Sequence, residues 1–463
     1  DILVLKNNKG SEDNRVRKLD YSIQITKLFY ERFIKNENIT LFSPNNVPGL
    51  YEAFGMPEFD EMYKKYEADE TIPKTTITAQ ELFMDMLKER AETGRIYIMN
   101  LDHCNSHSSF KDKIYMSNLC QEITLPTIPI QHIDDKEGEI ALCILSAINL
   151  GLINDINELE ELCDLSVRAL DEIIDYQEYP VESAKISTQA RRSLGIGYIG
   201  LAHYLAKNQV SYESKTAVKL VDKLTEAFQF YLLKASNNLA KEKSKCLWFE
   251  KTKYSEGILP IDTYKKELDE IISRKYTYDW EWLRKEIKEH GLRHSTLSAQ
   301  MPSESSSVVS NATNGVEPPR DYLSVKKSKK GPLKQIVPDY NRLKNFYTLL
   351  WDMKSNEGYI NIISVMQKYF DQAISGNWSY NPENYKDGEV PLSIMAQDLL
   401  TTYKLGWKTA YYQNTYDAKS EIDEPVHPIG WHDGVEEVDN SKTEWKEENK
   451  EILNDEECES CTI

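Results

Sequence analysis

The stretch Ala79-Gln-Glu-Leu-Phe-Met-Asp-Met-Leu-Lys-Glu-Arg-Ala-Glu92, closely followed by Arg95-Ile-Tyr-Ile-Met99, decides the fold class of this sequence. In the first part apolar residues recur at i, i+3 and i+4, which predicts an amphipathic helix, and the second part is a short β-rich run. Alternation of helices with short strands is typical of βαβ units and of a mostly parallel sheet or barrel. We therefore expect an α/β fold.

The same alternation continues along the rest of the chain. Helical periodicity predicts further helices at residues 21–35, 159–176, 215–241 and 340–347. Apolar, β-rich runs predict further strands at residues 140–145 and 359–363.

Composition and charge exclude several classes of protein. The chain has 463 residues, 40% hydrophobic and 28% charged, which indicates a globular protein rather than a wholly disordered one. A net charge of −19 argues against nucleic-acid binding. No run approaches the roughly 18 apolar residues of a membrane span, and no secretory signal is visible. Seven scattered cysteines favour a reducing compartment, so we expect a cytoplasmic protein that does not bind membranes.

The end of the chain differs in character from the part before it. Residues 417–463 contain sixteen acidic and four basic residues, hence a charge of −12, and leave only −7 for the preceding 416 residues. The segment shows no sustained periodicity. It is therefore predicted to be a flexible acidic tail.

A polar cluster occurs in Ser117-Asn-Leu-Cys-Gln-Glu-Ile-Thr-Leu-Pro126. Asn118, Cys120 and Glu122 stand at i, i+2 and i+4, so in an extended segment their side chains would share one face. A thiol between a carboxamide and a carboxylate suits an active site, because one group reacts, one hydrogen-bonds and one moves a proton. The same spacing also fits an alternating surface strand with a half-buried cysteine.

Three further patterns have ordinary structural explanations. Cys143 stands in an apolar run and is expected to be a buried core cysteine. Gly195-Ile-Gly-Tyr-Ile-Gly200 matches the dinucleotide fingerprint, but the polar segment before it makes close packing at a bend the better interpretation. Asp102-His-Cys-Asn-Ser-His107 lacks the second ligand pair that zinc requires, so no metal site is predicted.

Three patterns leave a functional interpretation open. Met301-Pro-Ser-Glu-Ser-Ser-Ser-Val-Val309 predicts a loop entering a helix, whose N-terminus is either simply capped or binds a phosphate. Tyr411 and Tyr412 are adjacent, but one adjacent pair is expected by chance in a chain with 28 tyrosines. Cys458 and Cys461 form a C-x-x-C pair in the acidic tail, where a disulfide could close and be carried elsewhere.

Taken in order, these motifs resemble the large, catalytic subunit of class I ribonucleotide reductase. The motifs are Asn118-Leu-Cys-Gln-Glu122, the Cys143 run, Met301-Pro-Ser-Glu-Ser-Ser306, Tyr411-Tyr-Gln-Asn-Thr-Tyr416 and the terminal cysteine pair. Flanking stretches such as Gly94-Arg-Ile-Tyr-Ile-Met-Asn-Leu-Asp-His-Cys-Asn agree with it. The resemblance covers essentially the whole chain. It implies the reduction of ribonucleotides to 2′-deoxyribonucleotides for DNA synthesis.

The resemblance implies a ten-stranded α/β barrel with a finger loop, near residues 118–126, through its centre. On that loop Cys120 would form the transient thiyl radical that takes the 3′ hydrogen of the substrate. Glu122 would accept the proton of the 3′-hydroxyl, and Asn118 would hydrogen-bond the ribose. Cys143 would be one of two cysteines that reduce the 2′ carbon.

It also implies roles for the C-terminal motifs. Tyr411 and Tyr412 would pass the radical from a small subunit whose metal centre generates it. Cys458 and Cys461 would re-reduce the active-site disulfide and then be reset by thioredoxin or glutaredoxin. The substrate phosphates would be held by five residues: Pro302, Ser303, Glu304, Ser305 and Ser306.

The family's N-terminal region, with the first barrel strands and the second reducing cysteine, does not precede Asp1. We therefore expect residues 1–416 to form an incomplete barrel, in a fragment or split subunit that a second chain with the N-terminal strands completes. The chain is expected to be inactive without that chain and the small subunit. Nucleotide effectors such as ATP and dNTPs are expected to bind mainly to the N-terminal part, and this chain to bind no cofactor. An oligomer is expected, with a ribonucleoside diphosphate as substrate.

Two alternatives belong to other classes of protein. A nicotinamide-dependent oxidoreductase would depend on Gly195–Gly200 alone. A non-catalytic scaffold that binds the small subunit would need neither the 118–122 cluster nor the terminal cysteine pair, so the presence of both argues against it.

Overall fold

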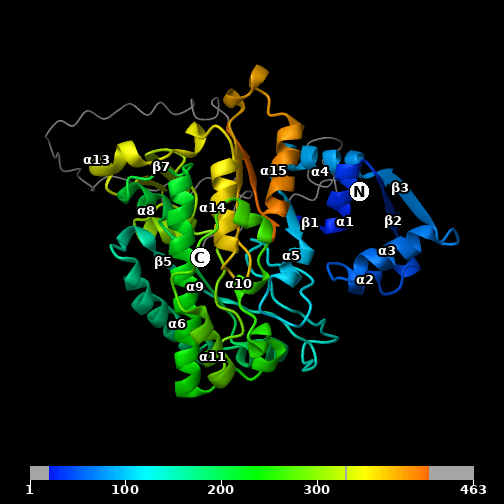
Figure 1. Cartoon of the computed structure of the whole chain (residues 1–463), viewed down its shortest axis with the longest axis horizontal. Coiled ribbons are helices and arrows are strands. Elements are labelled where there is room, and N and C mark those ends of the chain that lie inside the picture. The colour runs from blue at the N-terminus through cyan, green and yellow to red at the C-terminus, as the bar shows by residue number, and fades with distance from the viewer. Residues whose placement is uncertain (1–19, 329–330, 417–463) are drawn as a thin grey trace, which may run out of the picture.

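The structure is a computed structural model that describes residues 20–328 and 331–416 (Figure 1). Within that part it has both helices and strands, as the predicted α/β class requires. The strands are β1 (Tyr21–Ile25), β2 (Asn38–Phe42), β3 (Lys74–Thr78), β4 (Ile96–Asn100), β5 (Ile144–Asn149), β6 (Leu194–Ile199), β7 (Leu323–Ser328), β8 (Gly331–Ile336), β9 (Trp378–Tyr380), β10 (Thr409–Ala410) and β11 (Gln413–Thr415).

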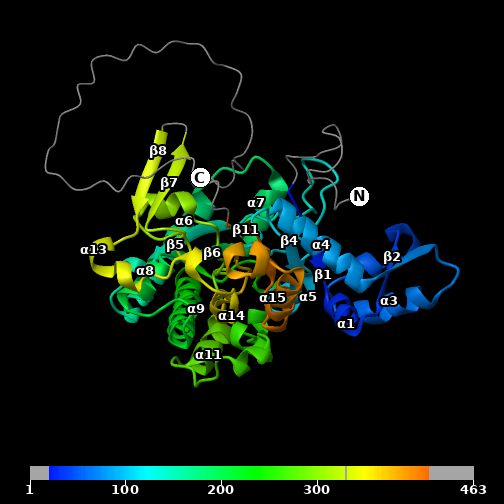
Figure 2. The same cartoon turned by 90° about the horizontal axis from the view of Figure 1, so that it is seen from above.

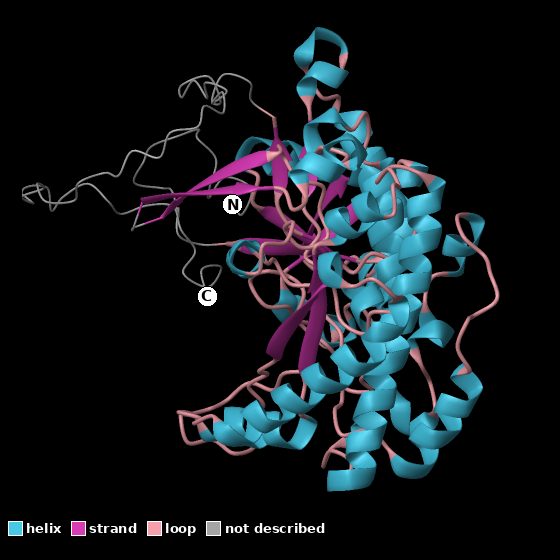
Figure 3. Ribbon diagram, turned by 90° about the vertical axis from the view of Figure 1, so that its left-hand side faces the viewer, coloured by secondary structure: helices cyan, strands magenta, loops and turns pink. Residues whose placement is uncertain are grey.

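The α-helices range from single turns to a helix of 29 residues. They are α1 (Lys27–Lys35), α2 (Leu50–Ala53), α3 (Phe59–Ala68), α4 (Ala79–Thr93), α5 (Leu101–Ser106), α6 (Leu159–Tyr176), α7 (Glu182–Arg191), α8 (Leu201–Lys207), α9 (Lys215–Lys243), α10 (Pro260–Thr263), α11 (Trp280–His290), α12 (Glu304–Val309), α13 (Tyr340–Leu343), α14 (Glu357–Gln367) and α15 (Leu392–Lys404). Figure 3 shows most of them gathered on one side of the strands.

One group of strands runs in parallel through the middle of the molecule. β5 pairs with β6, and single parallel bridges continue the pairing to the segments around Ser298 and Ile374. The second of these segments leads into β9, which pairs in parallel with β11. Neighbouring parallel strands that are covered by helices are the expected product of βαβ units.

A second group of strands contains one antiparallel pair. β10, which directly precedes β11 in the chain, runs antiparallel to β4, and β4 pairs in parallel with β1. Within the described residues no pairing joins β5 to β1, so the described sheet is open at these two strands. The closed ten-stranded barrel and the domain boundary at residue 416 therefore stay predictions.

The main hydrophobic core surrounds α9. This helix begins where the Ser214 hydroxyl accepts the N–H of Ala217 at 3.1 Å, and Lys241 and Lys243 lie in its last turn. A serine hydroxyl that accepts a backbone N–H favours the start of a helix, and basic side chains in the last turn favour its end. α6, α11 and α14 pack around α9, and α6 also packs against the parallel strands β5 and β6.

Two parts project from this body in Figure 2. A small lobe is made of the antiparallel pair β2 and β3 with α2 and α3, and it has its own apolar cluster around Phe59 and Tyr63. The antiparallel hairpin β7–β8 projects elsewhere, and the basic residues Lys326 and Lys327 belong to β7. Neither part belongs to the parallel sheet.

Four predicted elements are confirmed, and four are corrected. The helices at 79–92, 159–176 and 215–241 and the strand at 95–99 are present, whereas the helix predicted at 340–347 ends at Leu343 and continues as a short 3-10 turn. Residues 21–25 form β1 rather than helix, because Tyr21, Ile23 and Ile25 also alternate with period two and pair with β4.

The other two corrections concern short apolar runs. Residues 359–363, predicted as a strand, lie inside α14, because a run buried on all sides has no periodicity that separates strand from helix. The strand predicted at 140–145 begins only at Ile144. Among the described residues, the structure contains no helix with the length and apolarity needed to cross a membrane.

Candidate active site

The three polar residues of the finger loop lie on a tight turn. The chain reverses near Gln121, whose φ of +71° is left-handed. The side-chain oxygen of Asn118 accepts the N–H of Ile123 at 3.0 Å and closes the turn. The prediction of an extended segment with three side chains on one face is therefore wrong, because local hydrogen bonds of an asparagine side chain favour a turn.

The segment between α14 and β9 holds this turn in place. The Ser375 hydroxyl donates to the carbonyl of Cys120 and lies 3.1 Å from a carboxylate oxygen of Glu122. The N–H of Ala373 donates to the carbonyl of Glu122 at 3.0 Å. Cys120 is 7% exposed and Glu122 is 2% exposed, so both residues of this turn are buried.

Three tyrosines lie next to Cys120. The Tyr411 hydroxyl donates to the Cys120 sulfur over 3.5 Å. The rings of Tyr411 and Tyr412 are 4.3 Å apart between centroids, and the ring of Tyr97, on β4, lies 4.7 Å from that of Tyr411. The sequence analysis did not identify Tyr97 as a site residue. Tyr97 reaches this cluster only because β4 pairs antiparallel with β10. The predicted pair Tyr411 and Tyr412 is thus brought into one aromatic cluster with the predicted cysteine.

Burial controls the ionisation of these groups. It raises the pKa of the Glu122 carboxyl above its usual value, against the opposing effect of hydrogen bonds from Asn118 and Ser375. It also raises the pKa of Tyr411, which the contact with Cys120 raises further. The tyrosine therefore stays protonated, and a carboxyl with a raised pKa suits proton exchange with a substrate hydroxyl.

Cys143 lies immediately before β5 and is connected to the finger loop through Gln372. The Gln372 amide nitrogen lies 3.5 Å from the Cys143 sulfur and donates to the carbonyl of Leu194 at 2.9 Å. Its oxygen accepts the N–H of Thr124 at 3.2 Å. Cys143 as a residue is half-buried, and it packs against the apolar cluster that includes Leu101 and Cys104, so the prediction of a buried core cysteine is met only in part. Gln372 carried no signal in the sequence.

Burial of the thiol raises the pKa of Cys143 to about 12, and the hydrogen bond from Gln372 opposes this rise. A Cβ on Gly195 would lie 3.0 Å from the same sulfur, so the glycine leaves room for it. Gly195–Gly200 thus packs closely, as predicted, but mostly inside the buried strand β6 rather than at a bend. This is not the loop after a strand that a dinucleotide fingerprint requires, so the basis for a nicotinamide-dependent oxidoreductase is lost.

The predicted phosphate segment, Pro302–Ser306, is a loop that enters a helix, as expected. α12 begins at Glu304, and the side chain of Ser303 makes no capping hydrogen bond. The Ser303 hydroxyl instead donates to the carbonyl of Met301 at 3.2 Å, and Ser303 is 2% exposed. The binding of a phosphate by Pro302, Ser303, Glu304, Ser305 and Ser306 stays a prediction.

In the 102–107 motif, His103 and Cys104 lie on α5 and His107 follows its last residue. Cys104 is fully buried, and both ring nitrogens of His107 have partners, Thr263 at 2.8 Å and the Gln367 carbonyl at 2.7 Å. In the described part of the chain no three His, Cys, Asp or Glu side chains gather as metal ligands would. Cys458 and Cys461, with the whole 417–463 tail, lie outside the described residues.

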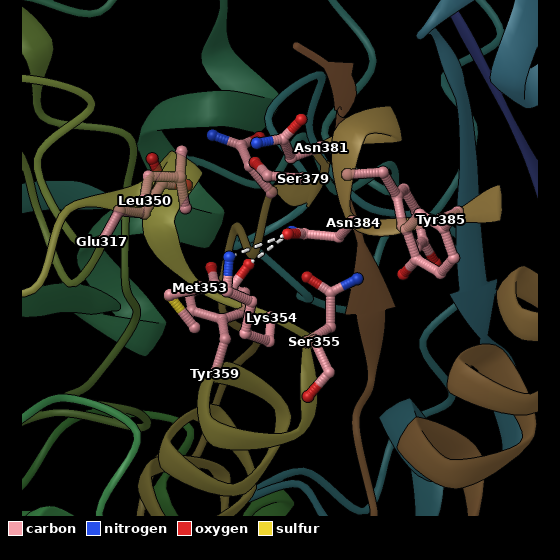
Figure 4. A pocket seen from close by; sticks show the side chains of 13 residues that line it. Glu317, Leu350, Met353, Lys354, Ser355, Tyr359, Ser379, Asn381, Asn384 and Tyr385 are labelled. Atoms are coloured by element: carbon pink, nitrogen blue, oxygen red, sulfur yellow. Dashed lines mark hydrogen bonds between the residues drawn. The ribbon is translucent and has the colours of Figure 1, made fainter. Parts of the chain in front are cut away.

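A separate hollow lies between α14 and β9 (Figure 4). Its free volume is about 20 Å³, close to the space of one water molecule. Across it Lys354 donates to the side-chain oxygen of Asn384 at 3.1 Å, and Asn384 donates to the carbonyl of Met353 at 2.9 Å. It contains none of the predicted site residues.

Comparison with known proteins identifies the family. The model of the ribonucleotide reductase barrel domain matches residues 1–413. The chain is 58% identical over 430 residues to the ribonucleoside-diphosphate reductase subunit alpha of Haemophilus influenzae, which covers 92% of this chain and 57% of that protein. It is 56% identical over 440 residues to ribonucleoside-diphosphate reductase 1 subunit alpha of Escherichia coli, covering 94% of this chain and 58% of the relative.

A more distant relative carries the same protein name. The ribonucleoside-diphosphate reductase subunit alpha of Chlamydia trachomatis is 31% identical over 472 residues, covering 90% of this chain and 43% of the relative. The chain thus spans little more than half the length of its more similar relatives. Because the family model matches about nine-tenths of its sequence, the chain belongs to the ribonucleotide reductase barrel domain family.

Proposed function

We propose that this chain supplies the catalytic barrel part of an enzyme that reduces ribonucleoside diphosphates to 2′-deoxyribonucleoside diphosphates. The printed names of its relatives support the substrate class. The observation that carries the proposal is the contact of the Tyr411 hydroxyl with the Cys120 sulfur, 3.5 Å away, beside the buried carboxyl of Glu122. An oxidisable phenol, a thiol and a proton acceptor are the groups that radical chemistry on a ribose requires.

The radical step uses the finger loop. Tyr411 passes an oxidising equivalent to Cys120, so that the thiol loses one electron and one proton to the tyrosyl radical and becomes a thiyl radical. The thiyl radical takes the 3′ hydrogen atom and leaves a carbon radical on the substrate. Glu122 accepts the proton of the 3′-hydroxyl, and Asn118 hydrogen-bonds the ribose. Pro302–Ser306 hold the diphosphate.

The reduction step uses Cys143 and a second thiol from outside the described residues. Together these thiols supply two electrons and two protons. The 2′-hydroxyl leaves as water, the two sulfurs form a disulfide, and the 3′ hydrogen returns from Cys120. Cys458 and Cys461 re-reduce this disulfide, and thioredoxin or glutaredoxin in turn reduces the tail pair.

Partners complete this proposal. A small subunit with a metal centre generates the radical and delivers it to Tyr412 and Tyr411. A polypeptide with further barrel strands meets the open strands β1 and β5, which would otherwise expose unpaired backbone groups. That polypeptide also carries the main sites for ATP and dNTP effectors.

The test is reconstitution. The 463-residue chain is assayed for reduction of cytidine diphosphate with thioredoxin, the small subunit and the N-terminal part of a close relative. Deoxycytidine diphosphate should form only when all components are present. Turnover without the N-terminal part would contradict its proposed role. Binding of the small subunit with no turnover in any combination would favour a scaffold.

A further inference from the structure

A buried cation lies beside the aromatic cluster of Tyr97, Tyr411 and Tyr412. Arg90, on α4, is 1% exposed, and no described carboxylate pairs with it. Its guanidinium donates to the carbonyl of Ile96, the residue before Tyr97 on β4. Burial lowers the pKa of Arg90 to about 10, so the side chain is still charged at neutral pH. A buried charge without an opposite charge is costly, which raises the question of what this one does.

The guanidinium lies over the indole ring of Trp378. Cζ of Arg90 is 5.8 Å from the centroid of that ring. Trp378, on β9, is 3% exposed, and its Nε1 has no hydrogen-bond partner among the described residues. An indole whose N–H has no acceptor keeps its proton when it loses an electron, so oxidation of Trp378 gives a radical cation. A positive charge over the ring attracts the neutral indole and repels the radical cation.

Trp378 is also a neighbour of the proposed radical path. Its backbone N–H donates to the carbonyl of Tyr412 at 2.8 Å, because β9 pairs with β11. From Trp378 the aromatic rings continue into the main core, to Trp407 at 6.1 Å and from there to Tyr359 at 6.0 Å between centroids. A radical that entered this branch of rings would leave the path to Cys120.

We infer that Arg90 keeps the radical out of this branch by making Trp378 harder to oxidise. The inference rests on the proposed function, because the oxidant is a tyrosyl radical at Tyr412. The step that Arg90 opposes is the transfer of one electron from the indole to that radical, which would leave a phenolate at Tyr412 and a radical cation at Trp378. Of the aromatic rings in the described chain, Arg90 lies over that of Trp378 alone, so its charge disfavours this transfer.

Photo-oxidation of the full chain tests the effect of the charge without turnover. A ruthenium photo-oxidant is attached to Lys386→Cys, at an exposed position in the segment after β9, in a chain that also carries Cys458→Ser and Cys461→Ser. A laser flash in the presence of a soluble electron acceptor oxidises the ruthenium, which then takes an electron from the protein. The radical cation of Trp378 is measured by its transient absorbance and assigned by its loss in Trp378→Phe.

Three variants separate the charge of Arg90 from its hydrogen bond. Arg90→Gln keeps an N–H donor for the Ile96 carbonyl and removes the charge, so the yield of oxidised Trp378 should rise by roughly 10-fold to 100-fold, the effect of one charge near a buried ring. Arg90→Lys keeps the charge, and its yield should stay within about 3-fold of the parent. Arg168→Gln is the matched control, because this arginine pairs with Glu242 at 2.7 Å on the outside of α6, and it should not change the yield.

Turnover of the assembled enzyme gives the second measurement. Arg90→Gln should lose activity after fewer turnovers than the parent, and mass spectrometry should find oxidised Trp378 in the inactivated chain. Adding Trp378→Phe should restore the number of turnovers, which a merely structural role of Arg90 would not allow. If the parent forms no deoxycytidine diphosphate, the proposed function fails, and photo-oxidation alone decides the effect of Arg90.

Thermal unfolding verifies that each variant is folded; if Arg90→Gln is not, Arg90→Met decides. Three results would each overturn the inference. The first is an equal yield of oxidised Trp378 in the parent and Arg90→Gln, and the second is a yield in Arg90→Lys as high as in Arg90→Gln. The third is an active parent whose number of turnovers Arg90→Gln matches.

Discussion

The surroundings of Cys120 and Cys143 differ although Gln372 and the finger loop connect them. Cys120 is almost fully buried and lies among aromatic rings, with the Tyr411 hydroxyl as its contact. Cys143 is a half-buried residue whose sulfur lies beside the polar Gln372 amide. An enclosed aromatic environment keeps a radical away from side reactions, whereas a hydrogen-bond donor beside a sulfur favours its thiolate, the reactive form in thiol–disulfide exchange.

The comparison shows that being a cysteine does not by itself determine what Cys120 or Cys143 does. For each thiol the sequence by itself also allowed an ordinary position in a strand. Their neighbours come from distant parts of the chain, Tyr411 in one case and Gln372 in the other. Substitutions should therefore separate a radical cysteine from a reducing cysteine.

The largest effect is expected at the radical side. Cys120→Ser and Tyr411→Phe should each abolish reduction of cytidine diphosphate in the assembled enzyme, because serine forms no accessible oxygen radical and phenylalanine has no oxidisable hydroxyl. Product formation is measured by chromatography. Tyr347→Phe is the control, since its buried hydroxyl bonds only to the Pro338 carbonyl, at 2.8 Å. Near-normal turnover of either variant would remove that residue from the radical path.

The next effect concerns the supply of reductant. Cys458→Ser with Cys461→Ser should leave the first turnover of the assembled enzyme intact and block later turnovers supported by thioredoxin. A protein reductant is too large to enter the site, whereas dithiothreitol can enter and should partly restore turnover. The measurement is product formed per enzyme with each reductant. Sustained turnover of the double variant with thioredoxin would show that the tail is not the shuttle.

A smaller effect is expected at the connection between the two regions. Gln372→Glu keeps the oxygen that accepts the N–H of Thr124 but removes the donor to Cys143 and adds a negative charge. The pKa of Cys143 should rise further from about 12. Alkylation of Cys143 by iodoacetamide at pH 8 should slow by roughly 2-fold to 10-fold, the effect of one hydrogen bond.

Mass-spectrometric mapping of the labelled peptide measures that rate separately for each cysteine. Gln335→Glu is the matched control, because the side chain of this partly exposed glutamine donates to the Ala312 carbonyl, at 3.0 Å, and contacts no thiol. Unchanged alkylation of Cys143 in Gln372→Glu would mean that Gln372 does not tune the thiol.

The smallest effect is on stability, at Glu122. Its folded-state pKa is raised, so the carboxyl contributes stability below its unfolded pKa of about 4.5 and loses that contribution as the pH rises through the folded value. Glu122→Gln cannot ionise. The free energy of unfolding of the parent chain, relative to this variant, should therefore fall as the pH increases from 4 to 8.

Urea denaturation at several pH values measures this difference. Glu281→Gln, at an exposed position on α11, should show no comparable trend. A difference between parent and Glu122→Gln that is constant with pH would contradict the raised pKa.

The sequence predicted a good part of this site from residue types alone. The helix at 159–176 and the polar cluster of Asn118, Cys120 and Glu122 were visible, because periodicity and close spacing are local properties. The order of the motifs also indicated the family, which the comparison with known proteins confirmed. The turn at Gln121 was missed, since it depends on which backbone groups Asn118 reaches.

Only the tertiary structure decided which distant residues meet. Tyr97 and Gln372 joined the site because β4 pairs with β10 and because the segment before β9 lies beside the finger loop, contacts between residues hundreds of positions apart. The sequence determined the elements and the reactive groups, because short-range periodicity and residue chemistry are written in neighbouring residues. Strand order and the burial that shifts each pKa are set by packing of the whole chain, and no local pattern contains them.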